Sequence, residues 1–305
     1  ETYSKLIEKE ISTFSFPSSP LNLYDPLRYF MTLGGKRMRP MLTLMSAKLF
    51  NKSVEESMSA ALAVELFHNF SLIHDDIMDD APLRRAKETV HEKWNLNTGI
   101  LSGDAMLVQA YQSLEVYEDS LFSSLTRMLS QTAIEVCEGQ QYDMDFETQS
   151  HVSQESYLEM IRLKTSVLLA ASLQMGAMAG KASEEQAAAF YNFGIQLGLA
   201  FQLQDDYLDC FGNPKTFGKK VGGDIITNKK TFLYLKTLQR SNETDARILK
   251  QLFSIFPEDP SEKVEQVKEL YVKSGAAKES LQEIIKYTLN ANNIIQELNI
   301  SDKNK

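Results

Sequence analysis

Apolar residues recur along this chain at helical spacing, and few turn-forming residues interrupt them. Leu62, Leu66 and Phe70 follow one another at intervals of four residues, which places them on one face of a helix. A capping-box pattern at 53–56 predicts that this helix begins there, and its periodicity continues to about Met78. The same periodicity predicts four further long helices, at about 100–116, 121–139, 154–179 and 184–211.

Proline and glycine residues predict the boundaries of the N-terminal helices. Asp25 and Pro26 match a helix start, with the aspartate as N-cap and the proline at the first helical position. The glycine pair at 34–35 would end that helix, because glycine is favoured just after a helix C-terminus. Pro40 then predicts the start of the next helix.

The C-terminal part is predicted to contain one long loop and four more helices. A loop rich in glycine and lysine extends over 212–230, and Pro257, Pro260 and Gly275 separate the helical segments after it. No linker, low-complexity tract or repeat of 20–50 residues divides the sequence. We therefore expect an all-α protein that forms one domain over residues 1–305.

Composition supports this fold class and narrows the function classes. Only 14 Gly and 8 Pro are present in 305 residues, too few for the turns of a sandwich or barrel. The net charge of −9 argues against a nucleic-acid partner, because such binding relies on a basic face. Two cysteines cannot form a disulfide framework or a structural zinc site, which favours a cytoplasmic location. No run of 18 or more apolar residues predicts a transmembrane segment.

Two aspartate clusters carry the strongest chemical signal. The sequences at 75–79 and 205–209 both read DDxxD, each at the C-terminal end of a long predicted helix. In each cluster the first and last aspartates are four residues apart and share a helix face, where they repel each other. A bound cation would relieve this repulsion, and Mg²⁺ suits carboxylates combined with waters and phosphate oxygens. The alternative is a solvated acidic helix face.

Basic residues form a second ordered set. Lys36 and Arg39 lie beside the glycine pair at 34–35, and an arginine pair at 84–85 follows the first aspartate cluster. Lys164 stands inside an apolar helix, where a buried lysine needs a partner. Lysines also occupy the loop after the second cluster, at 219, 220, 229 and 230. Any one of these residues alone is more often a solvated charge. Together with the aspartates they predict a diphosphate substrate that carries an apolar tail.

These motifs, taken together, resemble those of the trans-isoprenyl diphosphate synthases, the polyprenyl synthetase family, and in particular its short-chain geranylgeranyl and farnesyl diphosphate synthases. The matching stretches are GGKRMRP (34–40), ELFHNFSLIHDDIMDDAPLRR (65–85), SGD (102–104), KT (164–165), FQLQDDYLDCFG (201–212) and GKKVGGDIITNKK (218–230). The resemblance implies a bundle of long helices around a central apolar cavity. It also implies a prenyltransferase that condenses an allylic diphosphate (dimethylallyl, geranyl or farnesyl) head-to-tail with isopentenyl diphosphate and releases diphosphate.

The resemblance further implies a role for each matched residue. Three Mg²⁺ ions, with Mn²⁺ as a substitute, would be held by the aspartates of both clusters: Asp75, Asp79 and Asp205 directly, with Asp76, Asp206 and Asp209 supporting them. The allylic diphosphate would bind Arg84, Lys164, Thr165, Gln202, Lys219, Lys220 and Lys229, although Lys219 and Lys220 fit the loop pattern equally well. Lys164, Thr165 and Gln202 would orient and stabilise the reacting groups without donating protons. Isopentenyl diphosphate would bind Lys36, Arg39, His68 and Arg85. A homodimer is also implied.

Residues one or two turns before Asp75 would form a floor that sets product length. Phe70, Ser71 and Phe67 lie five, four and eight positions before Asp75. By similarity to the family, a bulky residue at the fifth position blocks long products, and an aromatic at the fourth accompanies C15 products. The chain has the first feature and lacks the second, which favours a C20 product, with C15 as the next choice. The alternative is that both phenylalanines are ordinary core residues.

Several alternatives and departures remain open. A class I terpene cyclase shares the first cluster but needs a second site that mixes Asn or Asp with Ser and Glu. A non-catalytic subunit of a heteromeric synthase usually loses one cluster. His74 and Asp75 also spell the metal dyad of a helical phosphohydrolase class, without the further histidines such a site needs. His68 has the alternative role of a core histidine. Ala86 stands where the family has glycine, which questions the turn there, and an arginine-rich tail is missing at the C-terminus.

Overall fold

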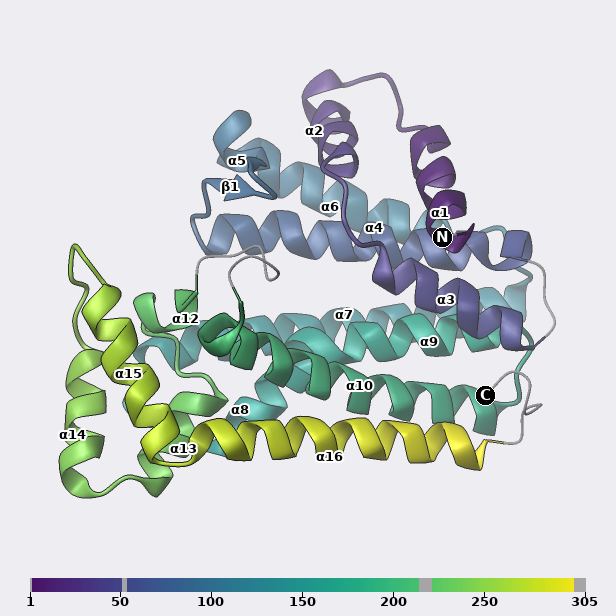
Figure 1. Cartoon of the computed structure of the whole chain (residues 1–305). Coiled ribbons are helices and arrows are strands. Elements are labelled where there is room, and N and C mark those ends of the chain that lie inside the picture. The colour runs from purple at the N-terminus through teal and green to yellow at the C-terminus, as the bar shows by residue number, and fades with distance from the viewer. Residues whose placement is uncertain (1, 51–53, 214–220, 299–305) are drawn as a thin grey trace. The chain divides into compact units, whose positions relative to one another are not determined.

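The protein is almost entirely helical in a computed structural model that describes residues 2–50, 54–213 and 221–298 (Figure 1). Among these residues the one sheet is a hairpin of two-residue strands. The elements are α1 (Thr2–Thr13), α2 (Leu21–Thr32), α3 (Met38–Leu49), α4 (Val54–Met78), β1 (Leu83–Arg84), β2 (Lys87–Glu88), α5 (Val90–Lys93), α6 (Leu96–Gln112), α7 (Asp119–Thr148), α8 (Gln154–Ile161), the π-helical turn η1 (Arg162–Ser166), α9 (Val167–Ala179), α10 (Glu184–Phe211), α12 (Gly223–Ile226), α13 (Phe232–Arg240), α14 (Glu243–Leu252), α15 (Ser261–Lys273) and α16 (Ala276–Glu297). No helix within these described ranges is both long and apolar enough to cross a bilayer.

The chain divides into two compact units. The first contains the described residues of 1–132 and 171–191, and the second contains 133–170 and 192–298. In the first unit, α4 packs against α3 and α6, and Figure 1 shows α4 and α6 side by side. The apolar face of α4 is inaccessible to solvent at Leu66 and Phe67, so burial of this face fixes which side of the helix points away from the core.

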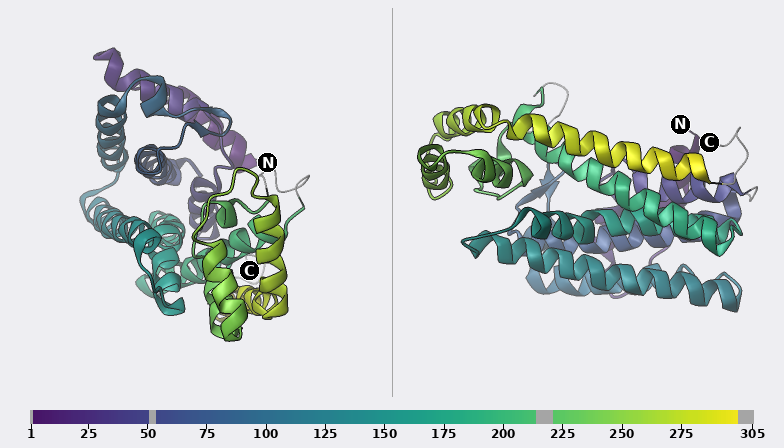
Figure 2. Two further views of the ribbon diagram at one scale, coloured as in Figure 1. Left: turned by 90° about the vertical axis from the view of Figure 1, so that its left-hand side faces the viewer. Right: turned by 90° about the horizontal axis from the view of Figure 1, so that it is seen from below.

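The second unit has its own core. Residues of α8, α10, α13 and α15 form it, with Tyr157, Leu203, Phe232, Val267 and Tyr271 almost fully buried. Helix α16 runs alongside α10 in two views (Figures 1 and 2), and Asn290 donates a hydrogen bond to Gln196 across this contact, at 3.2 Å. Burial of the apolar face of α10 therefore anchors the helix that ends in the second aspartate cluster.

The long helices confirm the predicted pattern, with differences at their ends. Helix α4 ends at Met78 as predicted, and α8 to α9 and α10 occupy the predicted ranges, whereas residue 53 of the capping box lies outside the described residues. Helix α7 continues to Thr148 rather than ending near 139, and the predicted loop at 212–230 contains the short helix α12. Four helices, α13 to α16, complete the chain as expected.

The predicted N-cap at Asp25 is wrong. Helix α2 already begins at Leu21, after Pro20, and it contains Pro26. The Asp25 carboxylate accepts from Arg28 at 2.5 Å, one turn along, so it is not used as a cap. Pro26 cannot donate a helical hydrogen bond, but its ring is buried together with Leu27, and this packing outweighs the missing bond.

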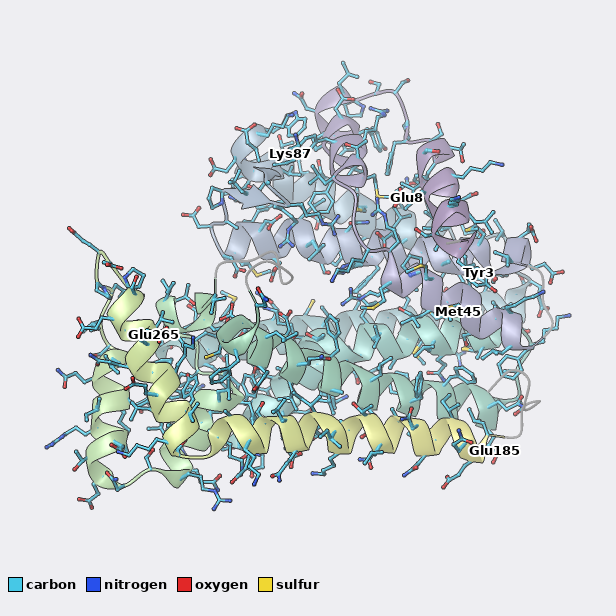
Figure 3. The ribbon with its side chains drawn as sticks, in the orientation of Figure 1. Tyr3, Glu8, Met45, Lys87, Glu185 and Glu265 are labelled. Carbon is cyan, nitrogen blue, oxygen red and sulfur yellow. The ribbon has the colours of Figure 1, made fainter. Side chains whose placement is uncertain are left out.

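A short hairpin after the first aspartate cluster was not predicted. Leu83 pairs with Glu88, and Arg84 pairs with Lys87. Lys87 is labelled in Figure 3. The two turn residues, Arg85 and Ala86, have φ of 53° and 60°, the left-handed pair that a tight two-residue hairpin turn requires. The doubt that Ala86 raised about this turn is thus answered, because the turn forms with alanine in a conformation that favours glycine.

Replacing Ala86 by glycine should stabilise the protein. A non-glycine residue in the left-handed region costs about 1–2 kcal/mol, part of which is offset by the larger unfolded-state entropy of glycine, so we expect a gain of about 1 kcal/mol. Urea unfolding measures it. The matched control is Ala188→Gly, at an exposed position inside α10, which should lose about 1 kcal/mol. A loss of stability in Ala86→Gly would contradict the assigned turn.

Candidate active site

The first aspartate cluster lies at the C-terminal end of α4, in the first unit. Asp76 is buried, and Arg84 from the hairpin donates to both its carboxylate oxygens, at 2.7 and 2.8 Å. Burial raises the pKa of Asp76, although Arg84 acts in the opposite direction. Asp75 is half-buried, 3.4 Å from Arg84, and Asp79 is exposed. The carboxylates of Asp75 and Asp79 therefore line the accessible face of the cluster, while Asp76 anchors the arginine.

A group of cationic side chains surrounds His68 in the same unit. Arg39 contacts the Nε2 atom of His68 with its Nη1 atom, at 3.1 Å. Burial and the charges of Arg39 and Arg85 lower the pKa of His68 well below its usual value, so the imidazole is neutral. A guanidinium can only donate, so Nε2 must be the acceptor and Nδ1 carries the proton.

Arg39 also has a hydrogen-bond donor without a partner. Its Nε atom is buried and contacts no acceptor among the described residues, and burial lowers the pKa of Arg39 to about 10. A buried donor next to further positive charge fits an anion such as phosphate. Of the residues predicted to bind isopentenyl diphosphate, the structure thus brings Arg39, His68 and Arg85 together, while Lys36 is exposed on the neighbouring loop.

Gly35 explains how the loop and the arginine pair meet. Its φ of 144° favours glycine, and a Cβ atom placed there would lie 2.8 Å from Nη1 of Arg85. The Arg85 guanidinium therefore lies directly against the backbone of the glycine loop. A larger residue at position 35 would displace the side chain, which is a physical reason for glycine beside the basic residues of this loop.

Arg37 is a residue of this loop that the sequence analysis missed. Its guanidinium is buried and donates to Glu65 at 2.6 Å, to Glu8 at 2.9 Å and to the carbonyl of Met31 at 2.9 Å. Glu8 is labelled on α1 in Figure 3. Arg37 therefore braces the loop instead of facing a ligand. A signal was available, because Glu65 stands in an apolar stretch of α4 and a buried carboxylate needs a cationic partner.

The predicted floor residues occupy the turns of α4 before the cluster. Phe67 is fully buried, and its ring meets that of Phe70 edge-on, with 5.5 Å between centroids. Phe70 is half-buried and also contacts the ring of His74, and the Ser71 hydroxyl donates to the carbonyl of His68. Phe70 thus remains accessible, whereas Phe67 is a core aromatic that supports it. Their role in product length stays a prediction.

In the second unit, Lys164 forms an ion pair, as expected for a lysine among apolar residues. The partner is Asp143 of α7, 2.6 Å from the ammonium group, and Lys229 lies 3.4 Å from the same oxygen. Burial alone would raise the pKa of Asp143, but Lys229 and Lys164 outweigh it and the net shift is downward. One carboxylate therefore holds two predicted phosphate-binding lysines side by side, which leaves a net positive charge.

Close packing of two helices brings Asp143 to Lys164. A Cβ atom on Gly139 would lie 2.3 Å from the backbone nitrogen of Lys164, so only glycine permits this approach. Asp143 stands one turn after Gly139 on the same face of α7. Lys164 and Thr165 belong to the π-helical turn η1, a local irregularity that recurs at functional sites. A glycine inside a long helix was the signal that could have located Asp143.

A chain of hydrogen bonds organises the second aspartate cluster. Thr165 donates to the Gln202 oxygen at 3.1 Å, and the Gln202 amide donates to Asp206 at 3.0 Å. Tyr157, fully buried on α8, donates to the other oxygen of Asp206. Burial raises the pKa of Asp206 to about 6, although these hydrogen bonds act to lower it. Both oxygens of Asp206 are thus used internally, and Tyr157 is a site residue that the sequence analysis missed.

Three further acids of the second unit, Asp205, Asp209 and Asp224, belong to the second aspartate cluster and its surroundings near the end of α10. Asp205 is half-buried, and Asp209 accepts from the backbone N–H of Asp224 at 3.0 Å. Burial and the charges of Asp206 and Asp209 raise the pKa of Asp224 to about 7. Asp224 extends the cluster to four acids, although it was predicted only as part of a matching stretch. Such a concentration of carboxylate oxygens fits a hard divalent cation.

The two described lysines after this cluster, Lys229 and Lys230, make different contacts. Lys219 and Lys220 lie outside the described residues. Lys229 contacts Asp143, whereas Lys230 donates to the carbonyls of Phe146, Glu147 and Gln149 at the end of α7. Lys230 therefore caps a helix and is not part of the predicted phosphate site.

Buried Lys263 holds the segment that carries Lys229. Its ammonium group donates to the side chain of Asn228 at 2.5 Å and to the carbonyls of Ile255 and Ile226. We expect Lys263→Met to destabilise the protein by about 2 kcal/mol, because three partly buried acceptors lose their donor. Urea unfolding measures this loss. The control Lys268→Met removes a half-buried lysine of the same helix that forms an ion pair with exposed Glu265. An equal effect of both substitutions would contradict the assignment.

The fold and these clusters define a class. Two DDxxD-bearing helices in an all-α chain, each accompanied by basic residues, are typical of the isoprenoid synthases. A family model described as polyprenyl synthetase matches residues 20–273. The chain belongs to the polyprenyl synthetase family, and the predicted fold and enzyme class, a prenyltransferase, are confirmed.

Three known proteins illustrate the similarity. The short chain isoprenyl diphosphate synthase of Methanothermobacter thermautotrophicus is 36% identical over 275 residues, 90% of this chain and 84% of that protein. A crystal structure of a geranylgeranyl pyrophosphate synthase is 50% identical with a TM-score of 0.93, covering 99% of this chain and 92% of the other. The geranylgeranyl pyrophosphate synthase of Corynebacterium glutamicum, complexed with isoprenyl diphosphate and magnesium, is 26% identical with a TM-score of 0.87, covering 99% and 95%.

Proposed function

We propose that this protein is a short-chain trans-prenyl diphosphate synthase that condenses an allylic diphosphate with isopentenyl diphosphate and releases diphosphate. One observation carries the proposal: the chain holds two different kinds of anion site. Carboxylate clusters with nearby lysines suit a diphosphate bound through cations, whereas the group of Arg39, His68 and Arg85 is cationic with a buried donor and suits a diphosphate bound directly. Condensation of two diphosphate substrates requires two anion sites.

Magnesium fits the donor sets of both aspartate clusters. Asp75, Asp79 and Asp205 offer accessible or half-buried carboxylates, the ligands that Mg²⁺ takes together with water and phosphate oxygens. When bound, Mg²⁺ stabilises the negative charge of the departing diphosphate. The count of three ions and the use of Mn²⁺ belong to this proposal. A magnesium complex of a family member with the same fold supports it.

The other aspartates of the two clusters would keep the metal ligands in place. Asp76 and Asp206 are already held by Arg84 and by Tyr157 with Gln202, and Asp209 by the backbone of Asp224. Fixed side chains pre-organise a site and reduce the reorganisation needed during the reaction. In this proposal these three aspartates orient ligands and metal-bound waters and do not contact the substrate.

Lys164, Lys229 and Arg84 would bind the allylic diphosphate. As the allylic C–O bond breaks, both electrons leave with the diphosphate, and these cations stabilise that charge. The π bond of isopentenyl diphosphate then forms the new C–C bond, and the proton lost afterwards goes to the released diphosphate. Thr165 and Gln202 orient the reacting groups as linked hydrogen-bonding residues and transfer no proton.

Isopentenyl diphosphate would bind at Lys36, Arg39, His68 and Arg85. The unpartnered Nε atom of Arg39 would then gain its acceptor, and the Arg85 guanidinium, set against Gly35, offers a planar pair of donors. Because His68 is neutral and accepts from Arg39, it orients this arginine and adds no charge of its own.

A terpene cyclase and a non-catalytic subunit, two alternatives raised by the sequence, are not favoured. The second cluster retains its aspartates and its hydrogen-bond support, which argues against a terpene cyclase and against a non-catalytic subunit.

Exposed Leu101 and Val108 lie two turns apart on one face of α6, which supports a homodimer. A cytoplasmic location is likewise proposed, from cysteine content alone.

Product length provides a separate prediction. We propose geranylgeranyl diphosphate (C20) as the main product, with farnesyl diphosphate (C15) as the next choice, because half-buried Phe70 lies one turn and a half before Asp75. Phe70→Ala should lengthen the main product by one or more C5 units, measured by mass spectrometry after dephosphorylation. Phe30→Ala, which shortens a fully buried aromatic of α2, is the control and should leave product length unchanged. An unaltered distribution in Phe70→Ala would exclude the floor.

The test of the proposed function is a direct incubation. The protein is mixed with Mg²⁺, isopentenyl diphosphate and either dimethylallyl, geranyl or farnesyl diphosphate, and products are identified by chain length. Elongation to C15 or C20 supports the proposal. Products of C30 or longer would retain the reaction and overturn the product assignment. No elongation with any starter would favour a non-catalytic subunit.

A further inference from the structure

A buried histidine outside both aspartate clusters has no hydrogen-bond partner. His91 lies in the short helix α5 with its side chain 9% exposed, and neither ring nitrogen has a hydrogen-bond partner among the described residues. An unsatisfied buried polar group costs roughly 1–3 kcal/mol, so a ligand at this position would be stabilising. Two carboxylates adjoin it, since ligand atoms of Asp80, His91 and Glu92 all lie within 4.8 Å of one another.

We propose that Asp80, His91 and Glu92 form a zinc site that is separate from the magnesium sites of the aspartate clusters. One imidazole nitrogen with two carboxylates suits zinc, whereas magnesium prefers oxygen ligands alone. The Nε2 atom of His91 and a carboxylate oxygen of Glu92 are 3.7 Å apart, too far for a hydrogen bond. An ion about 2.0–2.2 Å from each ligand atom spans such a gap, and water would complete its coordination.

The position of this site suggests what the ion would do. Asp80 immediately follows α4, and His91 comes directly after the hairpin, so the ion would join the two ends of the segment that carries the arginine pair at 84–85. Thr89 already draws these ends together through hydrogen bonds to the carbonyls of Ala81 and Pro82. Bound zinc would act as a structural clamp on the hairpin, and its existence does not depend on the proposed reaction.

The test measures zinc binding to the full-length protein. After removal of metals by EDTA, zinc is titrated calorimetrically in excess Mg²⁺, so that the aspartate clusters are occupied. We expect one zinc ion per chain at this site. Because loss of even an outer-shell partner costs about 10–100-fold in affinity, removal of a ligand in His91→Phe should weaken binding at least about tenfold. Co²⁺ in place of zinc should give a visible absorption spectrum that His91→Phe abolishes.

Two further variants keep the result interpretable if His91→Phe folds poorly. Asp80→Asn changes an exposed residue whose φ of 48° suits asparagine, and it should weaken zinc binding while the metal-free protein unfolds at the same temperature as the unmodified chain. The control is His151→Phe, at an exposed histidine before α8, which should bind zinc normally. Equal zinc affinity in Asp80→Asn and the unmodified chain would overturn the proposal, as would zinc binding that only Asp75→Asn abolishes.

Discussion

Replacing Asp75 by asparagine should lower kcat at least about a thousandfold while leaving the fold intact. The amide keeps the shape of the side chain but removes the charge that holds a divalent ion, and a thousandfold loss corresponds to about 4 kcal/mol of transition-state stabilisation. Asp75 is half-buried and lies beside Arg84, so the substitution also leaves this arginine with one acid less. Steady-state kinetics over a range of Mg²⁺ concentrations measures the loss together with a shift to higher metal requirement.

The matched control for this experiment is Asp119→Asn. Asp119 is an exposed aspartate in the first turn of α7, so the same change of charge and shape occurs away from both clusters. We expect its kcat and Mg²⁺ dependence to equal those of the unmodified enzyme. An Asp75→Asn enzyme that retains more than about one tenth of the activity would show that Asp75 is not a direct ligand.

Replacing Lys164 by methionine should lower kcat by about 100- to 1,000-fold, the usual loss when one preorganised donor to a developing negative charge is removed. The methionine keeps the apolar stem that packs in the helix, so the effect reports the ammonium group. Asp143→Asn should cost less, since Lys164 and Lys229 would remain near the substrate but lose the carboxylate that positions them.

The double variant separates positioning from structure. If Asp143 acts through Lys164, then Lys164→Met together with Asp143→Asn should be little worse than Lys164→Met alone, because the two residues form one unit. Lys273→Met is the control, at an exposed lysine that pairs with Asp245. Fully additive losses in the double variant would mean that Asp143 acts independently, and a loss equal to that of Lys273→Met would remove Lys164 from the site.

Features that repeat at helical spacing over many residues were predictable from the sequence. The apolar stripe of α4 and the four-residue spacing of Asp75 and Asp79 fix which face is buried and which carries the acids, and the structure agrees. The same holds for α10 and its cluster. These elements follow from helical periodicity alone, which does not depend on the rest of the fold.

Isolated partners were not predictable in the same way. Asp143 and Tyr157 are single polar residues on helices, and their importance arises from tertiary contacts with Lys164 and Asp206. The hairpin at 83–88 is too short for a period-two pattern to show, and its turn places Ala86 where propensity favours glycine. In each case packing or a buried charge outweighs the local preference.

The π-helical turn at 162–166 also restricts how this gene can change in length. Its hydrogen bond runs from the N–H of Val167 to the carbonyl of Arg162, five residues back, so the turn contains one residue more than an α-helix would. Deleting one residue here would remove the wide turn and restore the α-helical register, so Lys164 and Thr165, which lie inside the turn, would lose their present positions. The contacts of Lys164 with Asp143 and of Thr165 with Gln202 would then be lost. A change of length is therefore not tolerated in this short segment.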